Sequence, residues 1–457
     1  MKNITQNKVH FIGIGGIGTS ALASYFLHKG HKISGSDLVA SETTDDLKRK
    51  GVRIAISKKS KKLPKNLDLV IFSPAIPRNN LELKEAFRLQ ASGSRLRVLS
   101  YPEALGELTR QYFTIAVSGT HGKSTTTAML ALVLVKAGLD PTVIVGTKVK
   151  EFGGSNCRIA AKGEPRQGQG KSKYLVIEAD EHMASFLNYR PQIIVLTNIE
   201  EDHLDFYKNL GNILKAFKKY ISFLPSDGVL VANKDDKNIR NINSKFKNQK
   251  SKSQFKIQNY SLSQSEAKKL RSILKIPGEH NVTNALAVFK VAKLLKIPEK
   301  KIIEALSEYR GVWRRFEVSR RRIGGKNVIF VSDYAHHPTE VEATFKALQQ
   351  KFKNKKIICI FQPHQQQRTF YLFKDFVRVL KSFPGYRLII TDVFDVVGRE
   401  KKGIAKKVNA KMLVSSIDEP KVIYMEKKNI LNYLKRNLSG GEVVAVLGAG
   451  DIYKLII

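Results

Sequence analysis

The stretch VSGTHGKSTTT, residues 117–127, constrains this chain more than any other feature. An apolar run over residues 113–117 leads into a small glycine-containing turn, and a helix is expected over residues 125–136. Such a turn directs backbone N–H groups, a helix N-terminus and the side chain of Lys123 toward one point, which suits a polyphosphate. Ser124 follows the lysine, where a hydroxyl can hold Mg²⁺. The stretch therefore predicts a nucleotide site formed by Gly119, Thr120, His121, Gly122, Lys123, Ser124 and Thr125.

The full phosphate-loop pattern has glycine at position 117, where this chain has valine, so the match is a shortened GxxGKS. The alternative is a strand, turn and helix that hold no ligand. The lysine, the hydroxyl, the strand and the helix all fall where phosphate binding needs them, which favours the nucleotide site.

Composition sets the general class of the protein. A length of 457 residues predicts about three domains, and 42% hydrophobic residues indicate a globular α/β chain. The two cysteines, Cys157 and Cys359, lie far apart, so neither a disulfide framework nor a cysteine-based zinc site is expected. No apolar run reaches the roughly 20 residues of a membrane span. We expect a cytoplasmic protein without membrane insertion.

The chain is strongly basic, with 79 lysines and arginines against 40 acids and a formal charge of +39. One interpretation is nucleic-acid binding; the other is a solvated lysine surface on a protein that handles anionic ligands. The basic runs at residues 58–62, 300–301 and 401–402 are scattered, and no zinc-finger or RNP pattern occurs. We therefore expect nonspecific binding at low salt but no specific nucleic-acid partner.

Residues 1–107 are predicted to form one α/β domain. A strand over residues 9–12 runs into GIGGIG at 13–18, then a helix over 19–29 and a strand over 31–35. In a dinucleotide-binding fold the glycines admit a diphosphate and a following acid binds a ribose. A further strand, 69–72, ends in a loop of the kind that binds ligands in open sheets. The candidate substrate residues are Gly15, Gly16, Ile17, Gly18, Asp37 and Ser73.

Residues 108–312 are predicted to form the central domain around the phosphate turn. Strands over 174–177 and 193–196 are followed by acids and a histidine, among them Glu178 and His203, as a Mg²⁺-nucleotide site requires. Singly, each of these could be a helix cap or a surface charge. We expect a mobile loop over 161–173 and short strands and loops over 234–271. Asn281 begins a helix that runs to about residue 295, and either caps it or binds an adenine.

Residues 313–457 alternate strands with helices, which predicts a third, mostly parallel sheet. Polar clusters follow the strands at Asp333, at His336 and His337, at Arg368 and near residue 450. The histidine pair before a proline suits substrate contact, a buried structural role or a tight turn. The fold class expected is α/β with a Rossmann-like first domain, a central phosphate-loop ATPase domain and a Rossmann-like third domain.

Two anion-binding turns in separate domains imply two nucleotide-like ligands. One is ATP at Lys123; the other, at residues 13–18, is a dinucleotide or a nucleotide sugar. A hydride-transfer enzyme does not need the phosphate turn, and a plain ATPase does not need the first domain. An enzyme that consumes ATP to modify a nucleotide-bearing substrate needs both.

The chain also resembles a known family along essentially its whole length. The matching stretches, in order, are GIGGIGTSALA, SGTHGKSTTTAML, EADEHMASFL, TNIEEDHLDFY, GEHNVTNALA, GVWRRFE, DYAHHPTEV, FQPHQQQRT and LGAGDI. In these it resembles the Mur ligases of bacterial cell-wall synthesis, and most of all their alanine-adding branch. The resemblance implies a three-domain enzyme that joins an amino acid, expected to be L-alanine, to the lactyl carboxylate of UDP-N-acetylmuramate through an acyl phosphate. Attachment of a whole murein peptide, a nucleic-acid-associated NTPase and a non-catalytic binder are the alternatives.

The resemblance also implies residue roles. Lys123 and the N–H groups of residues 119–124 hold phosphates, Ser124 and Glu178 ligate Mg²⁺, and His203 ligates a second Mg²⁺. The residues implied for the remaining contacts are Arg315 for the γ-phosphate, Asp333 for the ribose, Asn281 for adenine, and Tyr334, His336 and Arg368 for the amino acid. Lys123, His203, Arg315 and His336 form the expected catalytic set.

Three positions stand out beside the family pattern. Gln365 replaces the first of two arginines usual after Phe-Gln-Pro-His, which puts the identity of the amino acid in question, because glutamine offers a carboxylate only neutral hydrogen bonds. Trp313 replaces a small residue or lysine, and interdomain packing is its expected role. Lys218 lies near a lysine that many relatives carbamylate, but no modification is predicted. The domains are expected to close around the ligands.

Overall fold

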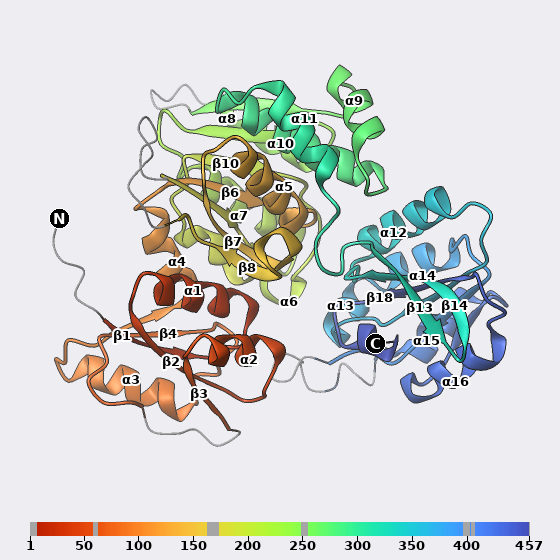
Figure 1. Ribbon diagram of the computed structural model, residues 1–457, viewed down its shortest axis with the longest axis horizontal. Coiled ribbons are helices and arrows are strands. Elements are labelled where there is room, and N and C mark those ends of the chain that lie inside the picture. Colours follow the sequence, from red (N-terminus) through yellow and green to blue (C-terminus); the bar gives the residue numbers. More distant parts are fainter. Residues whose placement is uncertain are drawn as a thin grey trace. The chain divides into compact units, whose positions relative to one another are not determined.

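The computed structural model describes residues 7–57, 63–161, 173–247, 255–395, 403 and 407–456 (Figure 1). The chain forms two compact units, the first comprising residues 1–199, 214–261 and 286–305, and the second comprising residues 200–213, 262–285 and 306–457. The lysine runs at 58–62 and 401–402, and the predicted loop 161–173 except its two end residues, lie outside the described part of the chain.

The first sheet has the order β3-β2-β1-β4-β5 and is parallel throughout. Val9, Phe11 and Ile12 on its central strand are buried, as expected for a strand covered on both faces. The predicted helix 19–29 begins two residues earlier, at Ile17. The elements are β1 (Lys8–Ile12), α1 (Ile17–His28), β2 (Lys32–Asp37), α2 (Glu42–Arg49), β3 (Arg53–Ile56), β4 (Leu69–Phe72), α3 (Leu81–Ala91), β5 (Arg97–Ser100) and α4 (Tyr101–Thr109).

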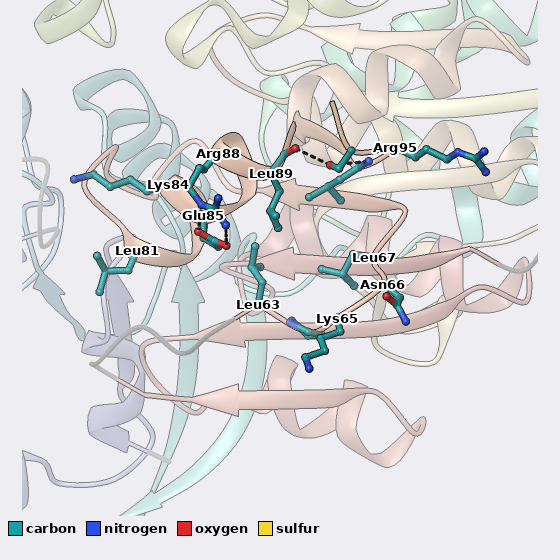
Figure 2. Close-up of a pocket in the computed structure, with 13 residues that line it drawn as sticks. Leu63, Lys65, Asn66, Leu67, Leu81, Lys84, Glu85, Arg88, Leu89 and Arg95 are labelled. Atoms are coloured by element: carbon teal, nitrogen blue, oxygen red, sulfur yellow. Dashed lines mark hydrogen bonds and ion pairs between the residues drawn. The ribbon is translucent and has the colours of Figure 1, made fainter. Parts of the chain in front are cut away.

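A pocket of about 930 Å³ lies beside α3 in the first unit (Figure 2). Leucines form its apolar lining, and basic side chains surround them: Leu63, Leu67, Leu81, Leu89, Leu96, Lys65, Lys84, Arg88 and Arg95. The segments that precede β4 and β5 line it, so it lies at the amino ends of these strands. Open parallel sheets bind ligands at the carboxyl ends. None of the residues predicted for ligand contact lines this pocket.

The second sheet, also in the first unit, has the order β12-β11-β10-β6-β9-β7-β8 and is parallel except for the β7–β8 pair. The carboxyl ends of β10, β6 and β9 therefore lie side by side at one edge. The strands are β6 (Phe113–Ser118), β7 (Thr142–Val149), β8 (Ser155–Arg158), β9 (Tyr174–Glu178), β10 (Ile193–Leu196), β11 (Val229–Asn233) and β12 (Lys256–Tyr260). The helices in and after this part of the chain are α5 (Lys123–Lys136), η1 (Lys150–Phe152), η2 (His182–Asn188), α6 (Leu204–Tyr207), α7 (Leu210–Ile221), α8 (Lys237–Lys247), α9 (Ser265–Ile273), α10 (Glu279–Leu294) and α11 (Glu299–Glu308).

The prediction for residues 234–271 was wrong in part, because two of its elements, α8 and α9, are helices. Ile239 and Ile242, three residues apart on α8, are buried, and so are Ala267 and Leu270 on α9. This spacing places each pair on one helical face. Each helix has only two or three apolar side chains among many polar ones, so the helical periodicity was too weak to predict either helix.

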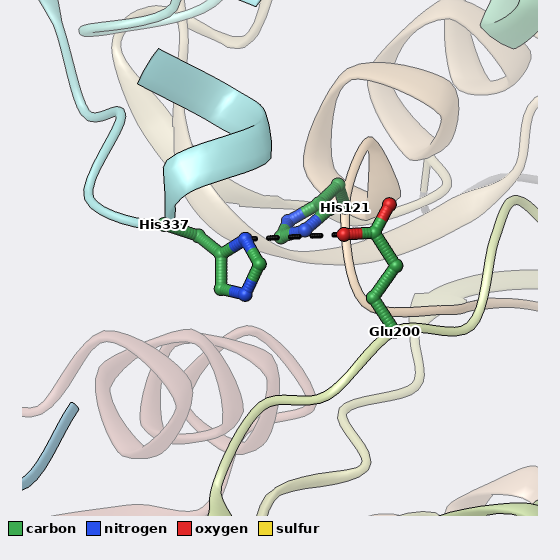
Figure 3. A group of neighbouring side chains, drawn as sticks. All are labelled: His121, Glu200 and His337. Atoms are coloured by element: carbon green, nitrogen blue, oxygen red, sulfur yellow. Dashed lines mark ion pairs between the residues drawn. The ribbon is translucent and has the colours of Figure 1, made fainter. Parts of the chain in front are cut away.

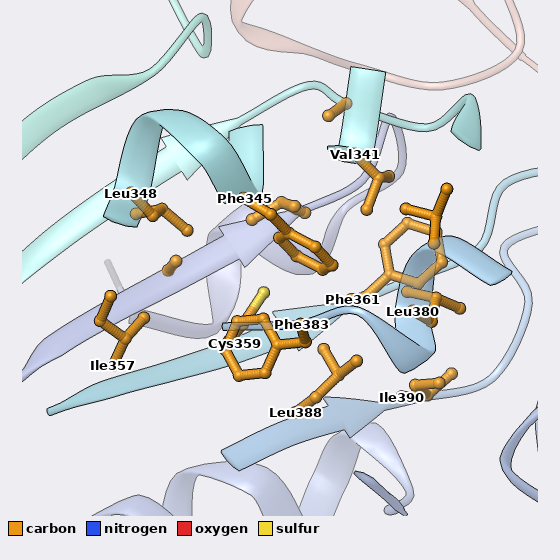
Figure 4. Packing of buried hydrophobic residues seen from close by; sticks show 14 of the residues in the cluster. Val341, Phe345, Leu348, Ile357, Cys359, Phe361, Leu380, Phe383, Leu388 and Ile390 are labelled. Atoms are coloured by element: carbon orange, nitrogen blue, oxygen red, sulfur yellow. The ribbon is translucent and has the colours of Figure 1, made fainter. Parts of the chain in front are cut away.

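The third sheet, in the second unit, has the order β13-β14-β18-β15-β16-β17 and is parallel except for β13. Alternate residues of β15 enter two cores. Ile357, Cys359 and Phe361 pack beneath α12 and α14 (Figure 4). Ile358 and Ile360 pack in the second core with residues of α16. The elements are β13 (Glu317–Ile323), β14 (Lys326–Asp333), α12 (Pro338–Lys351), β15 (Ile357–Phe361), α13 (Gln366–Tyr371), α14 (Phe373–Lys381), β16 (Arg387–Ile390), α15 (Ala410–Ile417), β17 (Val422–Tyr424), α16 (Lys427–Asn437), β18 (Val443–Leu447) and η4 (Ile452–Ile456).

The three sheets with their covering helices confirm the predicted α/β class. Cys157 and Cys359 are both buried free thiols. Within the described residues, no helix has the length and apolar character needed to span a bilayer.

Candidate active site

The turn between β6 and α5 is held by the residues that follow β10. Asn198 accepts the N–H of Thr120 at its carbonyl (3.0 Å) and the N–H of His121 at Oδ1 (2.8 Å), while Thr197 Oγ1 donates to the carbonyl of His121 (2.6 Å). Gly119 has φ +134°, and a Cβ built there would lie 2.1 Å from Thr197 Oγ1. Only glycine fits this close approach. The backbone of the predicted phosphate turn is thus fixed by its neighbours.

Lys123, the first residue of α5, folds its side chain back over the turn. Its Nζ donates to the carbonyl of Gly119 (2.7 Å) and to Glu181 Oε2 (2.8 Å), and Asp180 Oδ1 lies 3.7 Å away. Burial opposes the charged ammonium, but Glu181, Asp180 and Glu178 outweigh it and raise the pKa of Lys123. The lysine therefore stays cationic at the turn. Burial raises the pKa of the Glu181 carboxyl, and the adjacent Lys123 ammonium opposes this shift.

Glu178, the last residue of β9, faces Ser124. The hydroxyl of Ser124 lies 2.9 Å from Oε2 and 3.1 Å from Oε1, and the N–H of Gly146 donates to Oε2 at 2.7 Å. A hydroxyl and a carboxylate beside a phosphate turn are hard oxygen ligands of the kind Mg²⁺ prefers. The donor set therefore fits the predicted metal ligands Ser124 and Glu178.

The glycine turn of the first sheet is anchored to the end of β2. The N–H groups of Gly13 and Ile14 donate to the carbonyl of Ser36 (2.8 and 3.1 Å), and the N–H of Gly15 donates to Asp37 Oδ2 (2.8 Å). The Asp37 carboxylate thus supports the turn itself, a contact that the sequence did not predict. Gly16 precedes the first residue of α1, Ile17, whose side chain is exposed. Ser73, which follows β4, lies beside Gly13.

Tyr101 covers part of this glycine turn. Its ring closes over Gly18, where an added Cβ would meet Cζ at 2.7 Å. Burial first, and then the charges of Glu178 and Asp180, raise the pKa of the Tyr101 hydroxyl. The tyrosine therefore closes one side of the glycine turn.

In the second unit, Asp202 and Arg368 form a two-point ion pair. Nε of Arg368 donates to Oδ1 (3.1 Å) and Nη2 donates to Oδ2 (3.2 Å). Burial opposes ionisation of Asp202, but Arg368, with His203 and His337, holds its pKa well below the usual range. His203 is next to this pair, with Nε2 3.7 Å from Asp202 Oδ2. A small pocket here is lined by Asp202, His203, Gln365, Arg368 and Tyr371, among others.

Asp333, the last residue of β14, organises the start of the third sheet's loops. Its carboxylate accepts the N–H groups of Phe316 (3.0 Å) and Ala335 (2.8 Å). Burial raises the pKa of Asp333 to about 6, against the opposing charge of Arg315. Arg315 lies over the ring of Tyr334, 5.0 Å from its centroid. Four of the predicted contact residues, Arg315, Asp333, Tyr334 and His336, are therefore neighbours.

His336 and Arg315 meet at a carboxylate that the sequence analysis missed. Glu340 lies 3.1 Å from His336 Nδ1 and 3.4 Å from Arg315 Nη1, through different oxygens. It occupies the third position of α12, where an acid commonly forms a capping box, and the spacing from His337 to Glu340 is the signal that could have indicated it. Glu181, which contacts Lys123, was missed in the same way: it belonged to an acidic run whose members the sequence could not rank.

His337 caps α12 rather than facing the cluster of Arg315 and His336. Its Nδ1 accepts the N–H of Thr339 (3.3 Å), its Nε2 lies 3.0 Å from the carbonyl of Glu201, and Glu200 Oε2 is 4.0 Å from Nδ1 (Figure 3). Of the three roles left open for the histidine pair, the buried structural role and the tight turn before a helix both describe His337, whose side chain is buried.

The remaining predicted residues have local contacts. Asn281 Nδ2 donates to the carbonyl of Pro277 (2.6 Å) at the start of α10. This is a turn contact, and adenine binding stays a prediction. Trp313 packs against Tyr453, with ring centroids 5.4 Å apart. Lys218 lies on α7 with Nζ 6.0 Å from the centroid of Phe246.

Together the first unit can hold phosphates and a divalent cation at Lys123, Ser124 and Glu178. The second unit offers a cation, Arg315, beside an imidazole, His336. Phosphoryl transfer requires cations beside the phosphates, and attack by an amine requires a group that can accept a proton. Each unit by itself therefore carries groups that such chemistry uses.

Three family models match the chain in succession: the Mur ligase family catalytic domain over residues 8–113, the Mur ligase middle domain over 117–292 and the Mur ligase glutamate ligase domain over 314–450. The UDP-N-acetylmuramate–L-alanine ligase of Clostridium kluyveri is 38% identical, covering 99% of this chain and 97% of its own. That of Caldicellulosiruptor saccharolyticus is 39% identical, covering 99% and 98%. The crystal structure of UDP-N-acetylmuramate-alanine ligase MurC from Thermotoga maritima superposes with a TM-score of 0.75 at 26% identity, covering 98% and 97%.

Proposed function

This chain belongs to the Mur ligase family, and we propose that it joins L-alanine to the lactyl carboxylate of UDP-N-acetylmuramate with the hydrolysis of ATP to ADP and phosphate. It is an ATP-dependent ligase of peptidoglycan precursor synthesis, as its full-length relatives indicate. The observation that supports the proposal most directly is the turn between β6 and α5, where Lys123 Nζ lies 2.8 Å from Glu181 Oε2 and the Ser124 hydroxyl lies 2.9 Å from Glu178 Oε2. A fixed ammonium beside a hydroxyl and a carboxylate suits a reaction driven by ATP and Mg²⁺.

In the first step the lactyl carboxylate attacks the γ-phosphorus of ATP and an acyl phosphate forms. Lys123 and those N–H groups of residues 119–124 that do not donate to Asn198 bind the β- and γ-phosphates, and Arg315 neutralises charge on the transferring oxygens. Asp333 binds the ribose and Asn281 the adenine. The turn over residues 15–18, with Asp37 and Ser73, binds the UDP part of the substrate.

Ser124 and Glu178 fit one Mg²⁺, because their oxygens lie 2.9 and 3.1 Å apart beside Lys123. His203, next to the buried carboxylate of Asp202, is the proposed ligand of a second. When bound, the metal supplies positive charge that offsets repulsion between the carboxylate and the triphosphate. The chain's own part is to present these ligands on a rigid turn, with Gly146 holding Glu178 in place.

In the second step an amine attacks the acyl carbon and phosphate leaves. Tyr334, His336 and Arg368 are the proposed contacts of the amino acid. Since Arg368 already holds Asp202, its charge is balanced before an amino acid arrives, and Gln365 adds none. We therefore propose a small amino acid bound with modest affinity. The proposed domains are residues 1–107, 108–312 and 313–457.

The test is the release of ADP as each component is omitted in turn. Release is expected only when ATP, Mg²⁺, UDP-N-acetylmuramate and an amino acid are all present, and turnover that ignores the UDP-sugar would falsify the proposal. A panel of amino acids, together with L-alanyl-γ-D-glutamyl-diaminopimelate, identifies the nucleophile. Preference for the tripeptide would assign the chain to murein peptide recycling instead. A Glu178→Gln variant should need a higher Mg²⁺ concentration for half-maximal rate than the same change at exposed Glu151 (Glu151→Gln).

A further inference from the structure

Glu340 touches two groups that the proposed reaction uses at different steps. Its Oε1 lies 3.4 Å from Nη1 of Arg315, and its Oε2 lies 3.1 Å from Nδ1 of His336. Oε2 also accepts the backbone N–H groups of His336 (3.1 Å) and His337 (3.4 Å). The side chain is only 11% exposed, so these contacts fix the carboxylate in one orientation.

The same contacts determine which nitrogen of His336 carries a proton. Nδ1 faces two acceptors, the Glu340 carboxylate and the carbonyl of Tyr334 at 2.9 Å. Neither can donate while the carboxylate is ionised, so Nδ1 must be the N–H of the ring. In the neutral imidazole the lone pair is then on Nε2. No residue of the described chain is found in a hydrogen bond to that nitrogen.

An amino acid reaches the enzyme mainly as its ammonium, which has no lone pair and cannot attack a carbonyl carbon. We propose that Nε2 of His336 removes this proton, and that Glu340 is the positioning residue that orients the ring and stabilises the imidazolium. This inference rests on the proposed function. The ammonium N–H bond breaks and the proton passes to Nε2. The freed lone pair forms the C–N bond, and the bond from the acyl carbon to phosphate oxygen breaks as phosphate leaves.

Glu340 also holds Arg315, whose guanidinium is confined between this carboxylate and the ring of Tyr334. Loss of the carboxylate therefore loosens the cation of the first step as well as the base of the second. Loss of the imidazole affects only the second step. A substitution of Glu340 should therefore slow both steps, whereas a substitution of His336 should slow only the second.

Hydroxylamine separates the two steps, because it is unprotonated at neutral pH and needs no base. The unchanged protein, given ATP, Mg²⁺ and UDP-N-acetylmuramate, should form the hydroxamate with hydroxylamine and the amide with L-alanine. His336→Asn keeps a donor near the Nδ1 position and removes Nε2. Its alanine-dependent kcat should fall about 100-fold, while its hydroxylamine-dependent kcat stays within about threefold.

Glu340→Gln retains the capping-box geometry, so α12 should remain folded. Its alanine-dependent kcat should also fall about 100-fold, and its hydroxylamine-dependent kcat should fall by about tenfold through Arg315. The matched control is Glu342→Gln on the same helix, where the carboxylate pairs with Lys346 and Arg378. This control should match the unchanged protein with both nucleophiles.

Each result decides something. Equal losses with alanine and hydroxylamine in His336→Asn would show that the imidazole is not the base, and unchanged kinetics in Glu340→Gln would remove its positioning role. If the unchanged protein forms no hydroxamate but releases ADP with some other acid, the proposed function fails and this inference fails with it. The unchanged protein could form the hydroxamate while His336→Asn loses the same factor in kcat with alanine and with hydroxylamine. That result would overturn this inference and leave the proposed function in place.

Discussion

Arg368 and Asp202, 166 residues apart in sequence, form a buried two-point ion pair, with Nε 3.1 Å from Oδ1 and Nη2 3.2 Å from Oδ2. Their side chains are 6% and 10% exposed. The guanidinium predicted to bind the carboxylate of an amino acid therefore already binds a carboxylate of the chain. The guanidinium of Arg368 thereby holds the segment that carries His203. Arg368 also lines the small pocket beside Gln365.

Replacing Arg368 by methionine should leave the Asp202 carboxylate without its cation at a site of low exposure. The protein should lose about 3–5 kcal/mol of stability. Adding Asp202→Asn should recover part of the stability, because no unpaired charge remains, but should not restore the KM for alanine. Denaturant unfolding and alanine titrations measure the two effects. If the double variant is no more stable than Arg368→Met, the unpaired charge of Asp202 is not the cause of the lost stability.

Replacing Lys123 by alanine should reduce ATP-dependent turnover at least about 100-fold, since an oriented cation at the phosphates is lost. Lys136→Ala provides the matched control on the same helix, where the lysine pairs with Glu304. Circular dichroism should show both variants folded. Full activity in Lys123→Ala would place the phosphate site elsewhere.

Gly119→Ala should abolish measurable ATP binding, because the added Cβ would lie 2.1 Å from Thr197 Oγ1 and push the turn away from its position. Gly153→Ala is the control: its φ is also positive, at +67°, but no atom lies within 4 Å of the added carbon. Calorimetric titration with a non-hydrolysable ATP analogue distinguishes the two. Equal affinities would mean that the turn tolerates displacement.

His10 should make the stability of the protein depend on pH. Burial lowers its pKa to about 4, so between pH 4 and 6.5 the unfolded chain binds more protons than the folded one. Stability should therefore rise with pH across this window, by roughly 3 kcal/mol at most. His10→Asn keeps a donor for Ser34, 2.9 Å from Nδ1, and removes the titration.

The measurement is the urea midpoint of both proteins at pH 5 and pH 7. Burial raises the pKa of nearby Glu82, and this contributes in the opposite direction, so the difference between the two proteins is the quantity to compare. The midpoint of the unchanged protein should fall more on acidification than that of His10→Asn. Parallel curves would show that His10 is not the titrating group.

Local patterns predicted most of the strands. The runs at 9–12, 113–117, 174–177 and 193–196 were confirmed within a residue, because a short apolar segment between glycine-rich or acidic ends has few alternatives to a buried strand. The helices α8 and α9 escaped prediction, since only a few apolar side chains on one face hold them to the fold. The Mur ligase family was likewise evident from motifs in order, and the family models confirm it.

The sequence did not predict which side chains pair with one another. Ribose binding by Asp37 stays a prediction, and the support that Asp37 gives to Gly15 was not predicted. Glu181 and Glu340 were not singled out, although they contact Lys123 and His336. Each of these contacts joins residues whose carboxylates looked equivalent to many others in sequence. Which acid lies within 3 Å of which cation depends on how strands and helices pack.

The sequence by itself determined where the backbone could cradle phosphate, because a glycine turn between a strand and a helix is a property of consecutive residues. Only the tertiary structure decided which charges meet: Arg368 with Asp202, and Glu340 with both Arg315 and His336. Hydrogen bonds and close ion pairs form only when side chains approach within a few ångströms, and no spacing along the chain reports such distances between separate elements.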